Sequence, residues 1–173
     1  MADMIPAWVD GTLTPVEKLD AHRRGLRHKA VSVFVFCGDA VLLQRRAMAK
    51  YHTPGLWANT CCTHPHWEEP AGDCAVRRLK QELGLHGMAP EWLQQVEYRA
   101  DVGGGMVEHE VVDLFVARLE SRPRLSPDPA EVMDTDWVDW GALQAEVSAS
   151  PERFVPWLRI YLRDHAETIG RGL

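Results

Sequence analysis

The feature that most constrains the fold is a pair of apolar stretches joined by a short turn. Residues 30–36, AVSVFVF, are rich in β-branched and aromatic side chains and carry little charge, which is typical of a strand. Residues 37–39, CGD, predict a turn, and residues 40–46, AVLLQRR, predict a second strand. This order predicts a β-hairpin.

The segment after the hairpin, residues 47–70, lacks helical or strand periodicity. It contains several residues that interrupt regular structure, which are Pro54, Gly55, Pro65 and Pro70. We therefore expect a long loop, and long loops inside compact domains are usually functional.

A helix is predicted over residues 71–84, AGDCAVRRLKQELG. Asp73 is a possible cap near its start, and Gly84 is a stop signal at its end. Apolar side chains recur at helical spacing at Val76, Leu79 and Leu83.

The following part of the chain predicts one more strand between irregular segments. Residues 101–105, DVGGG, predict a flexible turn, and residues 107–119 predict a strand with acidic residues at one end. Residues 121–131 are rich in proline and predict a connection without regular structure.

The two ends of the chain carry weaker signals. Residues 1–28 are mixed, with one short turn signal at Asp10-Gly11. Residues 151–166 predict a terminal helix that begins near Pro151 or Pro156. The order of hairpin, helix, strand, connection and helix predicts an α/β (α+β) domain with a mixed sheet.

Composition narrows the class of protein. The chain has 173 residues, of which 46% are apolar and 25% charged, so we expect one soluble globular domain spanning residues 1–173. A net charge of −6 argues against a nucleic-acid partner. No apolar run approaches the roughly 18 residues of a membrane span, and no signal peptide is evident. We therefore expect no membrane partner, a cytoplasmic location and four free thiols.

Residues 105–115, GMVEHEVVDLF, place two carboxylates on one face of the predicted strand. Side chains alternate along a strand, so Glu108 and Glu110 project to the same side. Adjacent carboxylates repel one another unless a cation lies between them. The pair therefore indicates either a cation site or a solvated strand end.

Histidines are numerous in this chain, and three lie upstream of the acidic strand at His22, His28 and His64. Imidazole and carboxylate ligands together suit zinc, manganese or iron. Lone histidines are usually structural or surface groups, and this is our default interpretation of His52, His66, His86, His109 and His165.

Residues 59–65, NTCCTHP, admit four interpretations. Cys61 and Cys62 could be metal ligands with His64, a redox pair, a catalytic thiol with a neighbour, or small packed residues. Adjacent cysteines form strained disulfides, which argues against the redox pair.

The predicted helix also fits an altered Nudix box. Matches to its spacing include Glu69, Arg77, Leu79, Glu82, Gly84 and Leu85. Thr63 replaces the first glycine of the box, and Arg78 and Gln81 replace two of its glutamates. An arginine at a metal-binding position would cripple magnesium-dependent hydrolysis, yet it can hold phosphate oxygens. Nearby basic residues suit a diphosphate, and these are Arg45, Arg46, Lys50, Arg77, Arg78 and Lys80.

In their order and spacing, these motifs resemble type I isopentenyl-diphosphate delta-isomerase, from about Lys18 to the terminal helix. The motifs that carry the resemblance are RRAMAK, PGLWANTCCTHP, AVRRLKQELG, GMVEHEV and FVPW. The resemblance implies a Nudix-like mixed β-sheet sandwiched between helices. It also implies interconversion of isopentenyl and dimethylallyl diphosphate through a tertiary carbocation, for isoprenoid biosynthesis.

The resemblance assigns roles to particular residues. The implied catalytic residues are Cys62, Glu110, Tyr98 and Trp157, and the implied diphosphate-binding residues are Lys18, Arg46, Lys50 and Arg78. One divalent ion (Mn²⁺, Zn²⁺ or Mg²⁺) would be held by His22, His28, His64, Glu108 and Glu110. A diphosphate-bridging Mg²⁺ would be held by Glu82. The segment 1–28 would thus supply metal and diphosphate ligands.

Chemically, Cys62 and Glu110 would supply the acid and the base, and the sequence leaves open which group has which role. Tyr98 would orient Glu110, and the face of Trp157 would stabilise the cation by about 2 kcal/mol. The expected partner is a small isoprenoid diphosphate, and the expected state is a monomer or weak dimer.

Two departures from the family pattern bear on this assignment. His22 and His28 are separated by one residue fewer than in the family, which makes His22 the least secure ligand. Cys61 stands where an apolar residue would serve, and we expect it to be packed. The alternatives are a Nudix hydrolase acting on a nucleotide and a non-catalytic zinc module that uses Cys61, Cys62 and His64.

Overall fold

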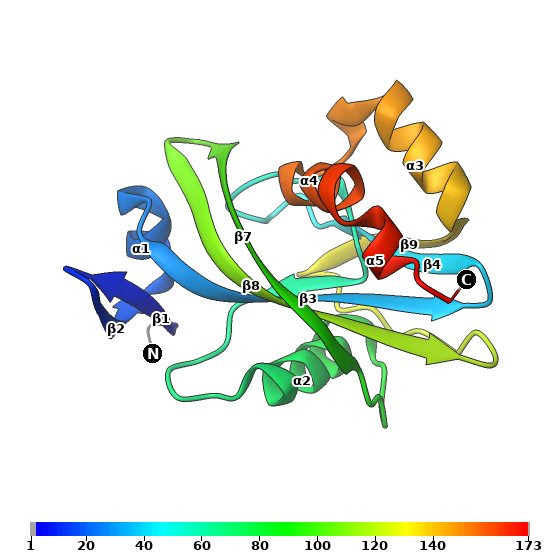
Figure 1. Ribbon diagram of the computed structural model, residues 1–173, viewed down its shortest axis with the longest axis horizontal. Coiled ribbons are helices and arrows are strands. Elements are labelled where there is room, and N and C mark those ends of the chain that lie inside the picture. Colours follow the sequence, from blue (N-terminus) through cyan, green and yellow to red (C-terminus); the bar gives the residue numbers. More distant parts are fainter. Residues whose placement is uncertain (1–2, 173) are drawn as a thin grey trace.

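Strand β3 (Arg27–Cys37) lies at the centre of a nine-stranded mixed sheet in the computed structural model, which describes residues 3–172 (Figure 1). It pairs in parallel with β8 (Met106–Leu119) along its whole length. Most of its side chains are buried because helices cover both faces of the sheet. The apolar run at 30–36 is therefore the middle of the core.

The predicted hairpin is confirmed, with β3 turning into β4 (Ala40–Arg46). Strand β4 then pairs with β9 (Val132–Asp139), which we did not predict. The prediction of a loop without strands over 47–70 is partly wrong. Two short strands, β5 (Trp57–Ala58) and β6 (Cys61–Thr63), form there because β4 and β3 offer them edges to pair with.

Helix α2 (Ala71–Leu83) covers one face of the sheet and confirms the predicted helix. Gly84 ends it in the left-handed conformation, and its N–H donates to Lys80 O at 3.0 Å. Asp73 is not the cap, because Pro70 holds the N-cap position without a side-chain hydrogen bond. Val76 is 39% exposed and so lies off the apolar face.

The other face is covered by α3 (Trp140–Ala149), α4 (Pro156–Asp164) and α5 (Ala166–Ile169) (Figure 1). The predicted terminal helix is therefore divided. Pro151–Arg153 form a separate 3₁₀ turn, and α4 begins at Pro156, which lacks the N–H that a first helical turn leaves unused.

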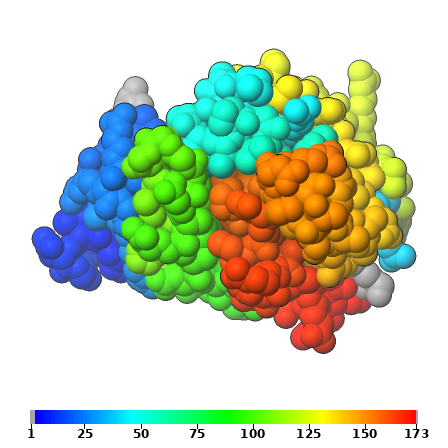
Figure 2. All heavy atoms as spheres, turned by 90° about the horizontal axis from the view of Figure 1, so that it is seen from above, coloured from blue at the N-terminus to red at the C-terminus, as the bar shows by residue number. Residues whose placement is uncertain are grey.

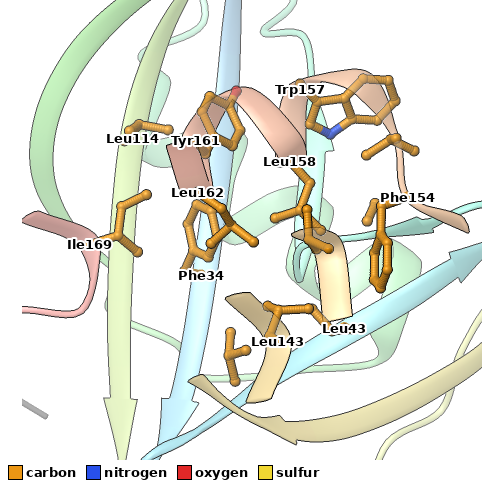
Figure 3. Packing of buried hydrophobic residues seen from close by; sticks show 14 of the residues in the cluster. Phe34, Leu43, Leu114, Leu143, Phe154, Trp157, Leu158, Tyr161, Leu162 and Ile169 are labelled. Carbon is orange, nitrogen blue, oxygen red and sulfur yellow. The ribbon is translucent and has the colours of Figure 1, made fainter. Parts of the chain in front are cut away.

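Helix α4 contributes several side chains to the core on this face of the sheet (Figure 3). Leu158 and Leu162 pack with Phe34 and with Leu143 of α3. In the same view the hydroxyl of Tyr161 points away from this apolar cluster.

Several elements were not predicted. Strand β7 (Glu91–Gly103) pairs with β8, so the predicted turn at 101–105 is reduced to Gly104-Gly105. The turn at Asp10-Gly11 is confirmed and joins β1 (Met4–Val9) to β2 (Thr12–Glu17). Helix α1 (Lys18–Arg24) follows, capped by the Glu17 carboxylate.

The α/β fold class, a mixed sheet between helical layers, is confirmed. Among the helices of residues 3–172, none is long and apolar enough to cross a membrane.

Candidate active site and metal centre

A cavity with about 390 Å³ of space, including the open solvent at its mouth, lies where α1, β6, β7, β8, α4 and the loop after β4 meet. Figure 2 shows the cyan segment that contains this loop bordering both the β7–β8 hairpin (green) and the C-terminal helices (orange to red). Most of the predicted site residues line it, namely Lys18, Arg46, Lys50, Cys62, His64, Arg78, Tyr98, Glu108, Glu110 and Trp157. Predicted residues outside this lining are His22, His28 and Glu82, all buried.

Two histidines present a bare ring nitrogen to the interior. His22 Nδ1 bonds to Lys18 O at 2.6 Å, and His28 Nδ1 bonds to Leu26 O at 2.7 Å. A carbonyl can only accept, so each Nδ1 carries the proton and each Nε2 offers a lone pair. Neither Nε2 atom finds a hydrogen-bond partner among residues 3–172. Such buried, oriented lone pairs are the arrangement that a metal-binding histidine requires.

Carboxylates on β8 lie beside these histidines and complete the cluster. Glu110 Oε1 lies 2.8 Å from His64 Nε2 and 3.4 Å from His28 Nε2. Ligands at right angles around a metal, each about 2.1 Å from it, lie about 3 Å apart, so these separations fit a shared ion. The donor atoms of His22, His28, His64 and Glu110 all lie within 4.8 Å of one another. This group is compatible with a divalent metal, and it includes His22 despite its shortened spacing.

Glu108 is placed differently from the expected five-ligand set. Its carboxylate lies close to His22 and His52 rather than to the other histidines. The Tyr98 hydroxyl joins the two acids, since it lies 2.9 Å from Glu108 Oε2 and 2.7 Å from Glu110 Oε2. The prediction that both glutamates point to one face is confirmed, and both are buried.

Burial sets the protonation of this cluster. Burial and the neighbouring His28 lower the pKa of His22 to about 4, and burial lowers the pKa of His64 well below its usual value. Both imidazoles are therefore neutral, as metal ligands must be. Burial and the Glu110 charge raise the pKa of Glu108. Burial opposes ionisation of Glu110 too, but the adjoining histidines outweigh it and lower its pKa.

Cys62 is held by a closed set of hydrogen bonds. Its Sγ donates to Asn59 Oδ1 at 3.0 Å and lies 2.9 Å from Ser32 Oγ, while Asn59 Nδ2 donates to that hydroxyl at 2.8 Å. Burial raises the pKa of the Cys62 thiol. Cys61 packs in the apolar cluster under α2, on the opposite face of β6. Because the two thiols point apart, the interpretation as one zinc site is wrong.

Two basic side chains of the cavity are paired with Glu131, an acid that the sequence did not single out. Glu131 forms ion pairs with both Lys50 and Arg78. Arg78 also donates to Glu82, at 3.0 Å from Nε and 2.6 Å from Nη2. Burial and the nearby Lys50 lower the pKa of Lys18. The cavity therefore holds a concentrated positive region, and Glu131 and Glu82 partly neutralise it.

Trp157 lies in the first turn of α4, with its ring 5.4 Å from the Arg46 guanidinium carbon. Its indole is 2% exposed. His52, which we assigned by default to surface or structure, is 5% exposed, and its ring lies 5.8 Å from that of Trp157. The sequence reasoning missed His52, Glu131, Ser32 and Asn59 as site residues, because none has a spacing signal that relates it to the other motifs.

A NUDIX domain model matches residues 26–158. A protein of Cereibacter sphaeroides named isopentenyl-diphosphate Delta-isomerase is 65% identical over 169 residues, which is 98% of this chain and 96% of that protein. The chain belongs to the isopentenyl-diphosphate delta-isomerase family. A protein of the same name from Roseobacter denitrificans is 63% identical over 98% of this chain and 96% of its own length.

Solved structures agree with the fold. A crystal structure from Deinococcus radiodurans superimposes with a TM-score of 0.73 at 13% identity, covering 92% of this chain and 97% of that one. A MutT NUDIX hydrolase from Burkholderia pseudomallei gives 0.61 at 19% identity, covering 80% of this chain and 98% of its own. At such low identity these likenesses concern the Nudix fold alone, so they do not favour hydrolysis over the isomerase family.

Proposed function

We propose that this protein interconverts isopentenyl diphosphate and dimethylallyl diphosphate for isoprenoid biosynthesis. The observation that carries the proposal is the 65% identity over nearly the full chain to a protein of that name. The cavity supports it independently, because a positive region and a possible metal centre lie around a thiol and a carboxylate. Whether the state is a monomer or weak dimer, and whether the location is the cytoplasm, remain predictions.

The diphosphate would bind to the cationic side of the cavity. Lys18, Arg46, Lys50 and Arg78 all reach this space from different elements. Guanidinium groups match phosphate oxygens in a bidentate manner, and ammonium groups add charge. Glu82 is the proposed ligand of a magnesium ion that accompanies the diphosphate, and in the structure its carboxylate accepts from Arg78 and Gln44.

The reaction adds a proton at one carbon of the alkene and removes another proton two bonds away. Cys62 and Glu110 both line the cavity and are the proposed acid and base. Asn59 and Ser32 hold the thiol in place, and Tyr98 orients the carboxylate. The face of the Trp157 indole is the proposed stabiliser of the tertiary cation, and the buried cavity keeps water from quenching it.

A divalent ion at the histidine site, Mn²⁺, Zn²⁺ or Mg²⁺, would make a bound carboxyl group more acidic. The residues that fit it are His22, His28, His64 and Glu110, with Glu108 adjoining through His22. The bare, buried Nε2 atoms of His22 and His28 support the assignment of a metal centre.

The test is proton NMR of isopentenyl diphosphate with the purified protein in deuterated water. Wild type is expected to produce deuterium-labelled dimethylallyl diphosphate, and Cys62→Ser and Glu110→Gln are expected to lose nearly all activity. Cys37→Ser, at a thiol remote from the cavity lining, is the matched control and should retain activity. Full activity in Cys62→Ser would refute the role of the thiol. Brisk phosphate release from nucleoside triphosphates with magnesium would instead favour the hydrolase.

A further inference from the structure

A fourth histidine adjoins the proposed metal centre. His52 lies in the loop after β4, and its Nε2 is 3.3 Å from Glu108 Oε1. Its ring is stacked near that of His22, with 5.8 Å between centroids and 29° between planes. We propose that His52 is a positioning residue that donates its Nε2–H to Glu108 and so fixes that carboxylate for the metal. The inference rests on the proposed metal centre and goes beyond the ligands expected for it.

The surroundings of Nδ1 decide where His52 carries its proton. Arg46 Nη2 lies 3.5 Å from His52 Nδ1, and the Thr53 hydroxyl lies 3.1 Å from it. A guanidinium can only donate, and a hydroxyl can donate, so Nδ1 is the accepting nitrogen. A neutral imidazole with an accepting Nδ1 has its proton on Nε2.

This proton arrangement is the opposite of that in the neighbouring histidines. His22 and His28 face backbone carbonyls with Nδ1, which leaves their Nε2 atoms bare for a metal. His52 faces donors with Nδ1, so its Nε2 presents a hydrogen to the Glu108 carboxylate. The same cluster thus contains histidines suited to bind an ion and one suited to hold a ligand of that ion.

Glu108 needs such a partner. Its Oε2 is engaged by the Tyr98 hydroxyl, so a donor on Oε1 fixes the plane of the carboxylate. Arg46 also donates to His52 O at 3.1 Å, which ties the loop that presents the imidazole to an arginine of the cavity. Losing a hydrogen-bond partner of a metal ligand typically reduces metal affinity by about 10–100-fold.

The competing arrangement makes His52 a metal ligand. The donor atoms of His22, His52 and Glu108 lie within 4.8 Å of one another, as ligands of one ion do. That arrangement needs a bare Nε2 on His52, so the two roles differ in which side chains can replace the imidazole. A glutamine amide reaches the position of Nε2 and donates, an asparagine amide reaches only the position of Nδ1, and phenylalanine keeps the ring without a donor.

The experiment measures Co²⁺ affinity by competition with a chelating dye, together with the visible absorption of the Co²⁺ protein. Variants are His52→Gln, His52→Asn and His52→Phe, with exposed His66→Gln as the control. We expect His52→Gln to bind like wild type, His52→Asn and His52→Phe to bind about 10–100-fold more weakly, and all spectra to keep their shape. Far-UV circular dichroism verifies folding, and the polar His52→Asn variant decides the matter if His52→Phe does not fold.

Three outcomes overturn the inference. Wild-type affinity in every variant would remove any role for His52. Equal losses of Co²⁺ affinity in His52→Gln and His52→Asn, with a changed absorption spectrum, would show that His52 is itself a metal ligand. A wild type that binds no Co²⁺ would refute the metal centre of the proposed function itself, which is a separate failure.

Discussion

Removing one buried acid should stabilise the metal-free protein. The Tyr98 hydroxyl has one proton and lies within hydrogen-bond distance of both Glu108 Oε2 and Glu110 Oε2. It donates to one carboxylate only, so without a metal the other acid must supply its own proton. Glu108 has the raised pKa, and it is therefore the acid that we expect to be protonated and to donate to Tyr98. Glu108→Gln replaces that O–H by an amide N–H without a titrating group.

The size of the effect follows from the geometry. The two carboxylate oxygens lie less than about 6 Å apart, where unit charges repel by about 3 kcal/mol at an effective dielectric constant of about 20. Keeping a glutamate protonated at pH 7 costs a similar amount, about 1.4 kcal/mol for each pH unit above its ordinary pKa of about 4.3. The metal-free wild type is destabilised by one of these two effects, the repulsion between the carboxylates or the cost of protonating one of them. Glu108→Gln should therefore raise its unfolding free energy by at most about 3 kcal/mol at pH 7.

The sign of the pH dependence is fixed by the raised pKa. Between the ordinary and the raised pKa the folded protein binds a proton that the unfolded chain has lost, so wild-type stability falls as the pH rises. The advantage of Glu108→Gln should be near zero at pH about 4.5 and grow by up to about 1.4 kcal/mol per pH unit. Mn²⁺ should narrow the difference, since saturation at about 100 times the Kd adds about 2.7 kcal/mol to wild type and less to the variant.

The assay is urea unfolding, followed by tryptophan fluorescence, in a chelating buffer at several pH values and again with Mn²⁺. Glu120→Gln, an exposed acid just beyond β8, is the control and should change neither curve. The reasoning fails if Glu108→Gln is less stable than wild type in chelator at pH 7. It also fails if its advantage persists unchanged at pH about 4.5, where protonation costs almost nothing.

Two further predictions concern stability away from the cavity. Gly84→Ala and Gly87→Ala both place a side chain at a φ of +68°, which costs about 1–2 kcal/mol, but only at Gly84 would the new Cβ meet Ser126, at 2.7 Å from its Cβ. Urea unfolding should thus show a larger loss for Gly84→Ala, and equal losses would contradict the packing. Glu69→Gln should cost about 1 kcal/mol at neutral pH by removing the bidentate pair with Arg77. Although partial burial opposes it, that pair lowers the pKa of Glu69, so the deficit should be complete above pH about 4.3 and vanish as the pH falls through the lowered pKa.

The sequence predicted the elements that have strong local signals. The β3–β4 hairpin and α2 were found because uninterrupted apolar runs and a glycine stop are local properties. Strand β7 was missed because most of its side chains, such as Trp92, are at least partly exposed and give no buried pattern. Tertiary pairing decides such strands, and a single sequence does not display it.

The residues of the candidate site also include some that the sequence predicted and some that it could not. The resemblance led to residues most of which line one cavity. His22, whose spacing looked least secure, lies with His28, His64 and Glu110 in the group that could hold a metal. His52 and Glu131 could not be found, since a lone histidine or glutamate signals nothing until its partners are known in space. Each makes its contact with a residue more than fifty positions away, Glu108 and Lys50 respectively.

Helix α2 explains why this Nudix fold is suited to a different chemistry. The box residues Glu69 and Arg77 still pair with each other, which attaches the segment before the helix to its second turn. Arg78, however, occupies a position that the box gives to an acid, and it pairs with the remaining buried Glu82. With its acidic face neutralised, the helix no longer offers a cluster of carboxylates to a metal. The cluster of buried carboxylates and imidazoles lies instead between β8, β3 and α1. In the proposed function an ion would therefore lie beside the alkene, and Arg78 of the helix would bind the diphosphate end of the substrate.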